Sequence, residues 1–164
     1  MLRTRLQNPV LLQLLASAGH GARVLIADAH YPVSTTLGPN AQVVHLNLVP
    51  GTVDAVTVLD ALLSAIAVEE VSVMQPNREG PYALDDEPPI WSRFKTSLAA
   101  AGFVEPFVEL ERFAFYEAAR EPDTAVVVAT GETEIYANLL LRVGVVRPPV
   151  EQEAVSTGGT DGTD

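Results

Sequence analysis

Short apolar runs alternate with amphipathic segments along most of this chain. The runs have the length and flanking turn residues of buried strands, and they predict strands over residues 23–27, 42–46, 70–74, 103–110, 125–129 and 135–143. The segments between them repeat apolar residues at helical spacing, and they predict helices over residues 9–18, 53–66, 90–101 and 111–120. Asn8 and Thr52 are the expected N-caps of the first two helices, and Gly19 and Gly102 the expected stops of the first and third. This alternation predicts an α/β domain with a largely parallel sheet covered on both faces.

The stretch from Gly19 to Pro32 holds the first candidates for chemistry. His20 lies between two glycines, and an imidazole can exchange protons near neutral pH. Asp28 and His30 follow the apolar run 24–27, at the strand end where α/β sheets bind ligands. The alternatives are a polar loop residue for His20, a turn residue or N-cap for Asp28, and a partner of backbone groups for His30. Because His20 precedes the strand and Asp28 follows it, the two side chains are expected at opposite ends, unless the chain folds back or a second subunit supplies one of them.

Two polar clusters follow later in the chain. Residues 112–117, Arg-Phe-Ala-Phe-Tyr-Glu, combine a guanidinium with aromatic rings, a setting that suits carbohydrates. The alternative is a helix that packs its aromatic side chains into the core and leaves Arg112 exposed. Residues 130–132, Thr-Gly-Glu, precede residues 136–138, Tyr-Ala-Asn, and could equally form an ordinary turn with an edge aromatic. His45 lies in an apolar strand pattern and is expected to be structural.

Composition excludes several function classes. The formal net charge of −11 argues against binding to nucleic acid or to anionic membranes, both of which require basic surfaces. With no cysteine, the chain has no disulfide, no thiolate nucleophile and no thiolate metal site. The sequence shows no signal peptide, no stretch of membrane-spanning length and no glycine-rich nucleotide motif. These features predict a soluble cytoplasmic protein.

Two segments stand apart from the predicted elements. Residues 75–89 form a long polar loop with four prolines, and loops of this length are usually functional or mobile. Residues 149–164 form an acidic tail rich in Gly and Thr, which is expected to be disordered. The expected organisation is one domain over residues 1–148 followed by this tail.

Four motifs in this order resemble the D-ribose pyranase / L-fucose mutarotase family, and most closely its fucose branch. They are residues 19–21 (Gly-His-Gly), 28–32 (Asp-Ala-His-Tyr-Pro), 112–117 (Arg-Phe-Ala-Phe-Tyr-Glu), and 130–132 together with 136–138. The resemblance implies a three-layer α/β/α sandwich, assembled as a decamer of two pentameric rings with sites between subunits. It also implies that neither a cofactor nor a metal takes part.

The same resemblance implies a role for each candidate residue. His20 is similar to the family's catalytic proton donor, Asp28 to its sugar-binding aspartate, and Arg112 to the sugar-binding arginine of the fucose branch. Tyr136, Ala137 and Asn138 match the C-terminal binding segment, and Tyr136 is a candidate partner of His20 in proton transfer. Since Ala137 stands where the fucose branch usually has glycine, a form closer to the ribose branch, the identity of the sugar stays open.

The function that these residues predict is cofactor-free interconversion of the anomers, or of the pyranose and furanose forms, of a free monosaccharide. L-fucose or a similar aldose is the expected substrate. The alternatives are a D-ribose pyranase, a sugar-binding protein without turnover, and a structural α/β assembly protein whose histidine is incidental.

Overall fold

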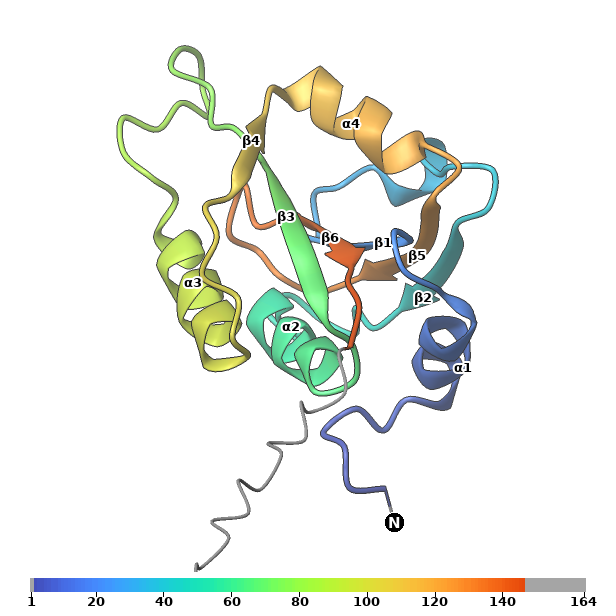
Figure 1. Cartoon of the computed structure of the whole chain (residues 1–164). Helices are drawn as coiled ribbons and strands as arrows, with labels where there is room; N and C mark the ends of the chain where they lie inside the picture. The colour runs from blue at the N-terminus through green and yellow to red at the C-terminus, as the bar shows by residue number, and fades with distance from the viewer. Residues whose placement is uncertain (1, 147–164) are drawn as a thin grey trace, which may run out of the picture.

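The computed structural model describes residues 2–146 and arranges them in three layers (Figure 1). The helices are α1 (Pro9–Ser17), α2 (Ala55–Leu63), α3 (Pro89–Ala100) and α4 (Arg112–Arg120), with a short 3₁₀ turn η1 (Val33–Thr35). The strands are β1 (Arg23–Ala27), β2 (Gln42–His45), β3 (Val68–Met74), β4 (Val108–Leu110), β5 (Thr124–Ala129) and β6 (Leu139–Val143). The predicted acidic tail, residues 149–164, lies outside the described residues.

The six strands form one mixed sheet in the order β2-β5-β1-β6-β3-β4. The pairs β2·β5, β5·β1 and β3·β4 are parallel, whereas β6 runs antiparallel to both of its neighbours, β1 and β3. The largely parallel sheet predicted from the sequence is therefore confirmed, with β6 as the exception. This exception matters for the site, because the start of β6 lies at the same edge as the ends of β1 and β3.

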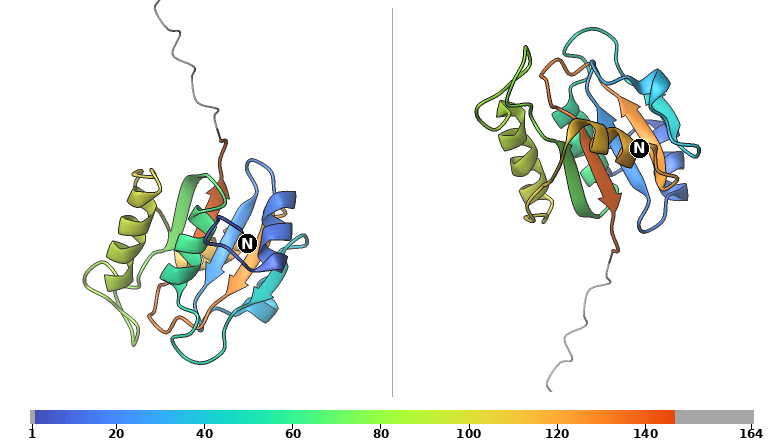
Figure 2. Two further views of the ribbon diagram at one scale, coloured as in Figure 1. Left: turned by 90° about the horizontal axis from the view of Figure 1, so that it is seen from below. Right: turned by 90° about the horizontal axis from the view of Figure 1, so that it is seen from above.

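Helices cover both faces of the sheet, unequally. Seen from below, α1 and α2 lie over the sheet with α3 beside them, and seen from above, α4 crosses the opposite face (Figure 2). Side chains of a strand alternate between the two faces, so Val24 and Ile26 of β1 enter the core under α1–α3 while Leu25 and Ala27 enter the core under α4. This double burial explains why β1 is an unbroken apolar run.

The structure corrects several predicted boundaries, of which these differ most from the prediction. Helix α2 begins after Asp54, whose carboxylate accepts a hydrogen bond from the Thr57 N–H at 2.8 Å, so Asp54 rather than Thr52 is its N-cap. Thr52 instead belongs to a tight turn, where its carbonyl accepts the N–H of Leu48. The fourth predicted strand shrinks to Val108–Leu110 and the last to Leu139–Val143.

Helices α1 and α3 were predicted to end at Gly19 and Gly102, and the structure agrees for Gly102 but not for Gly19. Gly102 follows α3 with φ +89°, a left-handed conformation that glycine adopts without strain. Helix α1 ends at Ser17, one residue earlier than predicted, and its C-cap, Ala18, is already extended. Of the two glycines beside His20, Gly21 has the positive φ of +83°, and its N–H donates to the carbonyl of Val143 at 2.9 Å.

Candidate functional site

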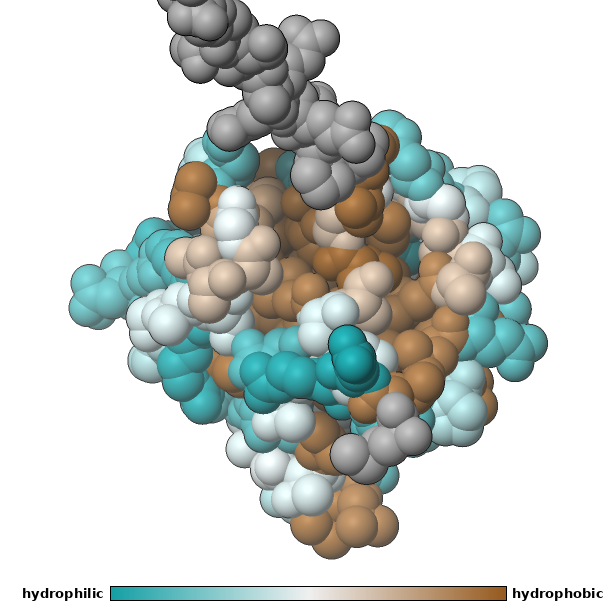
Figure 3. Space-filling model, turned by 60° about the horizontal axis from the view of Figure 1, so that its bottom comes forward, coloured by the Kyte–Doolittle hydropathy of each residue, from teal (hydrophilic) through white to brown (hydrophobic). Residues whose placement is uncertain are grey.

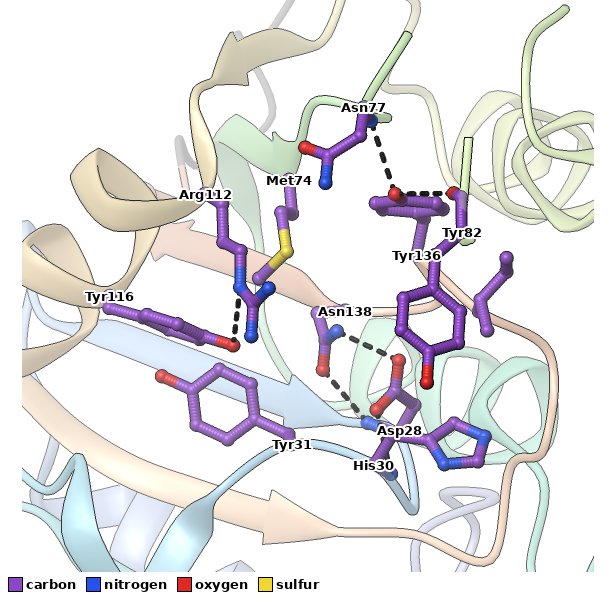
Figure 4. Close-up of a pocket in the computed structure, with 11 residues that line it drawn as sticks. Asp28, His30, Tyr31, Met74, Asn77, Tyr82, Arg112, Tyr116, Tyr136 and Asn138 are labelled. Atoms are coloured by element: carbon purple, nitrogen blue, oxygen red, sulfur yellow. Dashed lines mark hydrogen bonds between the residues drawn. The ribbon is translucent and has the colours of Figure 1, made fainter. Parts of the chain in front are cut away.

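A cavity of about 370 Å³ lies between α4 and the edge of the sheet where β1 and β3 end and β6 begins (Figure 4). It is lined by Asp28, His30, Tyr31, Met74, Asn77, Tyr82, Arg112, Tyr116, Ile135, Tyr136 and Asn138. The topology brings these residues together. Asp28 directly follows β1 and Asn138 directly precedes the antiparallel β6, so both arrive at one edge although 110 residues separate them.

Asp28 and Asn138 form a reciprocal pair at the floor of this cavity. The Asn138 amide donates from Nδ2 to Oδ2 of Asp28 at 2.8 Å, and its Oδ1 accepts the backbone N–H of Asp28 at 2.9 Å. The other carboxylate oxygen, Oδ1, accepts the N–H of His30 at 3.0 Å. Since a carboxylate can accept about four hydrogen bonds in all, Asp28 keeps capacity for the hydroxyl groups of a ligand.

Burial dominates the electrostatics of Asp28. The residue is only 4% exposed, and desolvation raises the pKa of its carboxyl above the ordinary value of 3.8. The N–H of His30, which donates to the carboxylate, acts in the opposite direction on this pKa, as does the nearby backbone of Ala137 and Tyr31, because these groups favour the charged form. The site thus holds a desolvated carboxylate whose interaction with a neutral hydroxyl donor is not screened by water.

Arg112 and Tyr116 reach the cavity from α4, where a spacing of four residues puts them on one face of the helix. The guanidinium lies 5.7 Å from the centroid of the Tyr116 ring, and its Nε donates to the Tyr116 hydroxyl at 3.4 Å. This hydrogen bond raises the pKa of Arg112 above its ordinary value. The packing alternative for this helix is correct in part, because Phe115 is fully buried while Phe113 is 68% exposed.

Tyr136 is held in an unusual position at the cavity wall. Its φ of +60° is the one positive value found in a non-glycine residue between residues 2 and 146, and its carbonyl accepts the indole N–H of Trp91 at 3.0 Å. The hydroxyl donates to the carbonyl of Tyr82 at 2.8 Å and accepts the N–H of Asn77 at 3.1 Å. Tyr136 therefore joins the cavity to the loop that follows β3, and one lone pair of its hydroxyl oxygen stays available.

Residues 130–134 and Ala137 support the site and do not line the cavity. Glu132 is buried, and its carboxylate accepts three backbone N–H groups, those of Thr133, Glu134 and Ala55. A side chain at Gly131 would clash with the backbone carbonyls of the turn around Thr52. Ala137 is fully buried, and it approaches the site through its backbone alone. The Thr-Gly-Glu pattern thus fixes the segment that carries Tyr136 and Asn138.

The structure places His20 away from this cavity. It lies in the turn before β1, at the opposite edge of the sheet, and the five residues of β1 put about 15 Å between that turn and Asp28. Its imidazole is 58% exposed and pairs with Glu69 of β3 at 2.9 Å from Nε2 to Oε2. The sequence-based expectation that His20 and Asp28 lie at opposite ends of one strand therefore describes this chain.

His30 is the histidine that lines the cavity among the described residues. Its Nε2 lies 3.2 Å from the carbonyl of Thr133, which makes it in part the partner of backbone groups that the sequence suggested. The sequence feature that indicated a place for His30 at the site is its position two residues after Asp28. Tyr31, Met74, Asn77 and Tyr82 also line the cavity, and the sequence alone did not single them out as site residues. His45, at the end of the edge strand β2, is exposed.

Two further observations concern the described part of the chain. Within residues 2–146, no three His, Asp or Glu side chains lie close enough together to hold a metal ion. Over the same residues, no helix is long and apolar enough to cross a membrane.

A single α/β domain with a polar, aromatic-lined cavity at one edge of a mixed sheet defines a class of small ligand-binding α/β proteins. Comparison with known proteins identifies the class further. The sequence pattern of the RbsD / FucU transport protein family matches residues 1–146, and the chain belongs to this family. The resemblance drawn from the four motifs is thereby confirmed.

Individual relatives agree with this assignment. The fucose mutarotase of Homo sapiens is 34% identical over 146 residues, covering 86% of this chain and 90% of the relative. The crystal structure of a fucose mutarotase from Streptococcus pneumoniae in complex with L-fucose superimposes with a TM-score of 0.73 at 28% identity, over 85% of this chain and 94% of that one. RbsD of Bacillus subtilis, solved with D-ribose, has a TM-score of 0.70 over 90% of this chain and the whole of that one, and at 23% identity it supports the fold alone.

Proposed function

We propose that this chain is a mutarotase that interconverts the anomers of a free monosaccharide, with L-fucose or a similar aldose as its substrate. The observation that carries this proposal is the cavity at Asp28 and Asn138, in a chain similar to fucose mutarotases along most of its length. A buried carboxylate, an amide, a guanidinium and several tyrosines offer the donors, acceptors and ring faces that a sugar requires. A D-ribose pyranase is the second candidate, because the same family includes RbsD.

The reaction opens and recloses a hemiacetal. A base removes the proton of the anomeric hydroxyl, an acid protonates the ring oxygen, and the bond between the anomeric carbon and the ring oxygen breaks. Rotation of the free aldehyde and reversal of these steps give the other anomer, so no group is lost or gained. Positioned acid and base groups contribute typically about 10²–10⁴-fold in rate, which suffices for a reaction that already proceeds in water.

In this proposal the residues of the cavity hold the sugar hydroxyls. Asp28 accepts hydrogen bonds from sugar hydroxyls at the acceptor positions that Asn138 and the N–H of His30 leave free. Arg112 donates to ring or hydroxyl oxygens, and the Tyr116 hydroxyl beside it is a further donor and acceptor. Tyr136, whose hydroxyl already bonds to Asn77 and Tyr82, remains a candidate for proton transfer through its free lone pair.

His20 enters the site, in this proposal, from a neighbouring subunit. Within one chain it lies at the opposite end of β1 from Asp28, yet it is exposed and paired with the Glu69 carboxylate at the surface of the protein. Apolar side chains are also exposed, including Leu2, Val10 and Leu48, and brown apolar residues gather in the centre of the face shown in Figure 3. These features support assembly, and the decamer of two pentameric rings and the cytoplasmic location stay predictions.

Saturation-transfer NMR between the anomeric protons of L-fucose tests the function directly. We expect the wild-type chain to accelerate exchange, His20→Ala to abolish the acceleration, and His30→Ala to retain most of it. Loss of exchange in His30→Ala with retention in His20→Ala would instead assign the proton-donor role to His30, which lines the cavity within one chain. Binding of L-fucose without faster exchange would identify a sugar-binding protein, and acceleration confined to D-ribose would identify a pyranase.

Subunit complementation tests whether two chains share the site. His20→Ala and Asp28→Asn are each expected to be inactive, but co-expressed subunits can combine the intact His20 of one with the intact Asp28 of the other. Random mixing in a shared-site assembly restores about a quarter of the sites. No recovery in a verified mixed assembly, with both single variants folded, would contradict a site shared between subunits.

A further inference from the structure

Tyr82 is a large aromatic side chain at the mouth of the cavity. It lines the cavity together with Asp28 and Tyr136, yet 63% of its surface is exposed. Figure 4 shows its ring on the side of the cavity opposite to Arg112 and Tyr116, extending from the loop toward the side where Asp28 and His30 lie. A side chain that lines a cavity and is also more than half exposed lies where an entering ligand would cover it.

The backbone that carries Tyr82 is fixed, although its ring is free. The hydroxyl of Tyr136 binds the carbonyl of Tyr82 itself and the N–H of Asn77. The Asn77 carbonyl accepts the N–H of Leu84 at 3.0 Å, which closes the segment 77–84 into a compact turn. Leu84 in turn packs against the core under α4. The backbone is therefore already in place, and ligand binding has to order only the side chain of Tyr82, which limits the cost in conformational entropy.

We propose that Tyr82 is a substrate-binding residue whose ring packs on an apolar C–H face of the bound sugar and closes the cavity over it. Asp28 and Asn138 lie at the ends of β1 and β6, and Arg112 lies on α4, whereas the Tyr82 ring offers an aromatic face on the side of the cavity toward the loop. The inference rests on the proposed function for its ligand. Tyr82 is expected to contribute to the affinity for the sugar and not to kcat, because its ring covers the substrate and the transition state equally.

Kinetics of four variants test the inference, because a residue that contributes only to binding should change KM and leave kcat nearly unchanged. Tyr82→Phe keeps the ring, Tyr82→Leu keeps an apolar side chain without a ring face, and Tyr82→Ala removes both. We expect KM for L-fucose to stay near wild type in Tyr82→Phe, to rise several-fold in Tyr82→Leu, and to rise about tenfold in Tyr82→Ala, the loss that accompanies roughly 50 Å² of uncovered apolar surface. The kcat should change less than twofold, because uniform binding is lost. Glu79→Ala, in the same loop and outside the cavity lining, is the matched control and should leave both constants unchanged.

A binding measurement separates this inference from the proposed function. Saturation-transfer difference NMR, with irradiation of the aromatic protons of the protein, should mark the C–H protons of L-fucose in wild type and in Tyr82→Phe, and mark them less in Tyr82→Ala. If wild type binds the sugar and accelerates no exchange, the proposed function fails while the difference between these variants still decides the role of Tyr82. Equal KM values and equal transfer in Tyr82→Ala and wild type, with the melting temperature unchanged, would overturn the inference. A rise in KM in Tyr82→Phe equal to that in Tyr82→Ala would also overturn it, because the hydroxyl and not the ring face would then be responsible for sugar binding.

Discussion

Replacing Asn138 with aspartate places a second carboxylate against Asp28 and tests the electrostatics of the cavity floor. The amide nitrogen of Asn138 lies 2.8 Å from Oδ2 of Asp28, and its orientation is fixed because Oδ1 accepts the Asp28 N–H. Two ionised carboxylates at this separation repel by about 6 kcal/mol at an effective dielectric constant of 20. Protonating an ordinary aspartate at pH 7 costs only about 4 kcal/mol. The Asn138→Asp pair therefore takes up one proton instead of carrying two charges.

This proton uptake sets both the size and the sign of the pH dependence. The folded variant binds one proton more than the unfolded chain at all pH values between the ordinary carboxyl pKa and the raised pKa of the pair. Its free energy of unfolding therefore falls as pH rises, by about 1.4 kcal/mol per pH unit. Burial already raises the pKa of Asp28 in the wild-type protein, which acts in the same direction, so the variant must be compared with a control in which Asp28 is retained.

Asn138→Ala is that control. It removes the two hydrogen bonds to Asp28, one of them to a charged group, and should cost about 2–4 kcal/mol without adding a titrating group. Urea unfolding at pH 5, 6, 7 and 8 gives the free energies of unfolding for all three proteins. We expect the difference between Asn138→Asp and Asn138→Ala to widen steadily against the aspartate variant as pH rises. A difference that does not change over this range would refute the reasoning, because the two carboxylates would then titrate independently.

Two further predictions concern α4. Phe115 is fully buried and packs edge-on against Tyr31, with ring centroids 6.3 Å apart, so Phe115→Ala should lower the free energy of unfolding by about 3–5 kcal/mol. The exposed Phe113, two residues earlier, is the matched control, and its replacement by alanine should change stability by less than about 0.5 kcal/mol; equal losses in urea titrations would contradict the assigned orientation of the helix. Arg112→Lys keeps the charge and removes the planar fork of donors, so KM for L-fucose should rise about tenfold, the factor that corresponds to roughly 1.4 kcal/mol. The melting temperature should stay unchanged, and an unaltered KM would show that Arg112 does not bind the sugar.

The sequence by itself determined the elements and the class of fold. Apolar runs such as 24–27 are short, lack polar positions and are bounded by turn residues, which favours a strand covered on both faces over a helix. Local signals of this kind also placed Asp28 at a strand end, Gly102 at a helix stop and Arg112 on a helix with aromatic neighbours. Each of these depends on residues within a few positions of one another.

Only the tertiary structure decided which of these residues meet. Asp28 and Asn138 form a pair because β6 inserts antiparallel between β1 and β3, and no local pattern specifies strand order or direction. The tertiary structure also brings Tyr82 to the cavity from a loop whose sequence carries no chemical motif. Contacts between distant segments follow from how the whole chain buries its apolar faces. The pattern within one segment does not specify which other segments it will pack against.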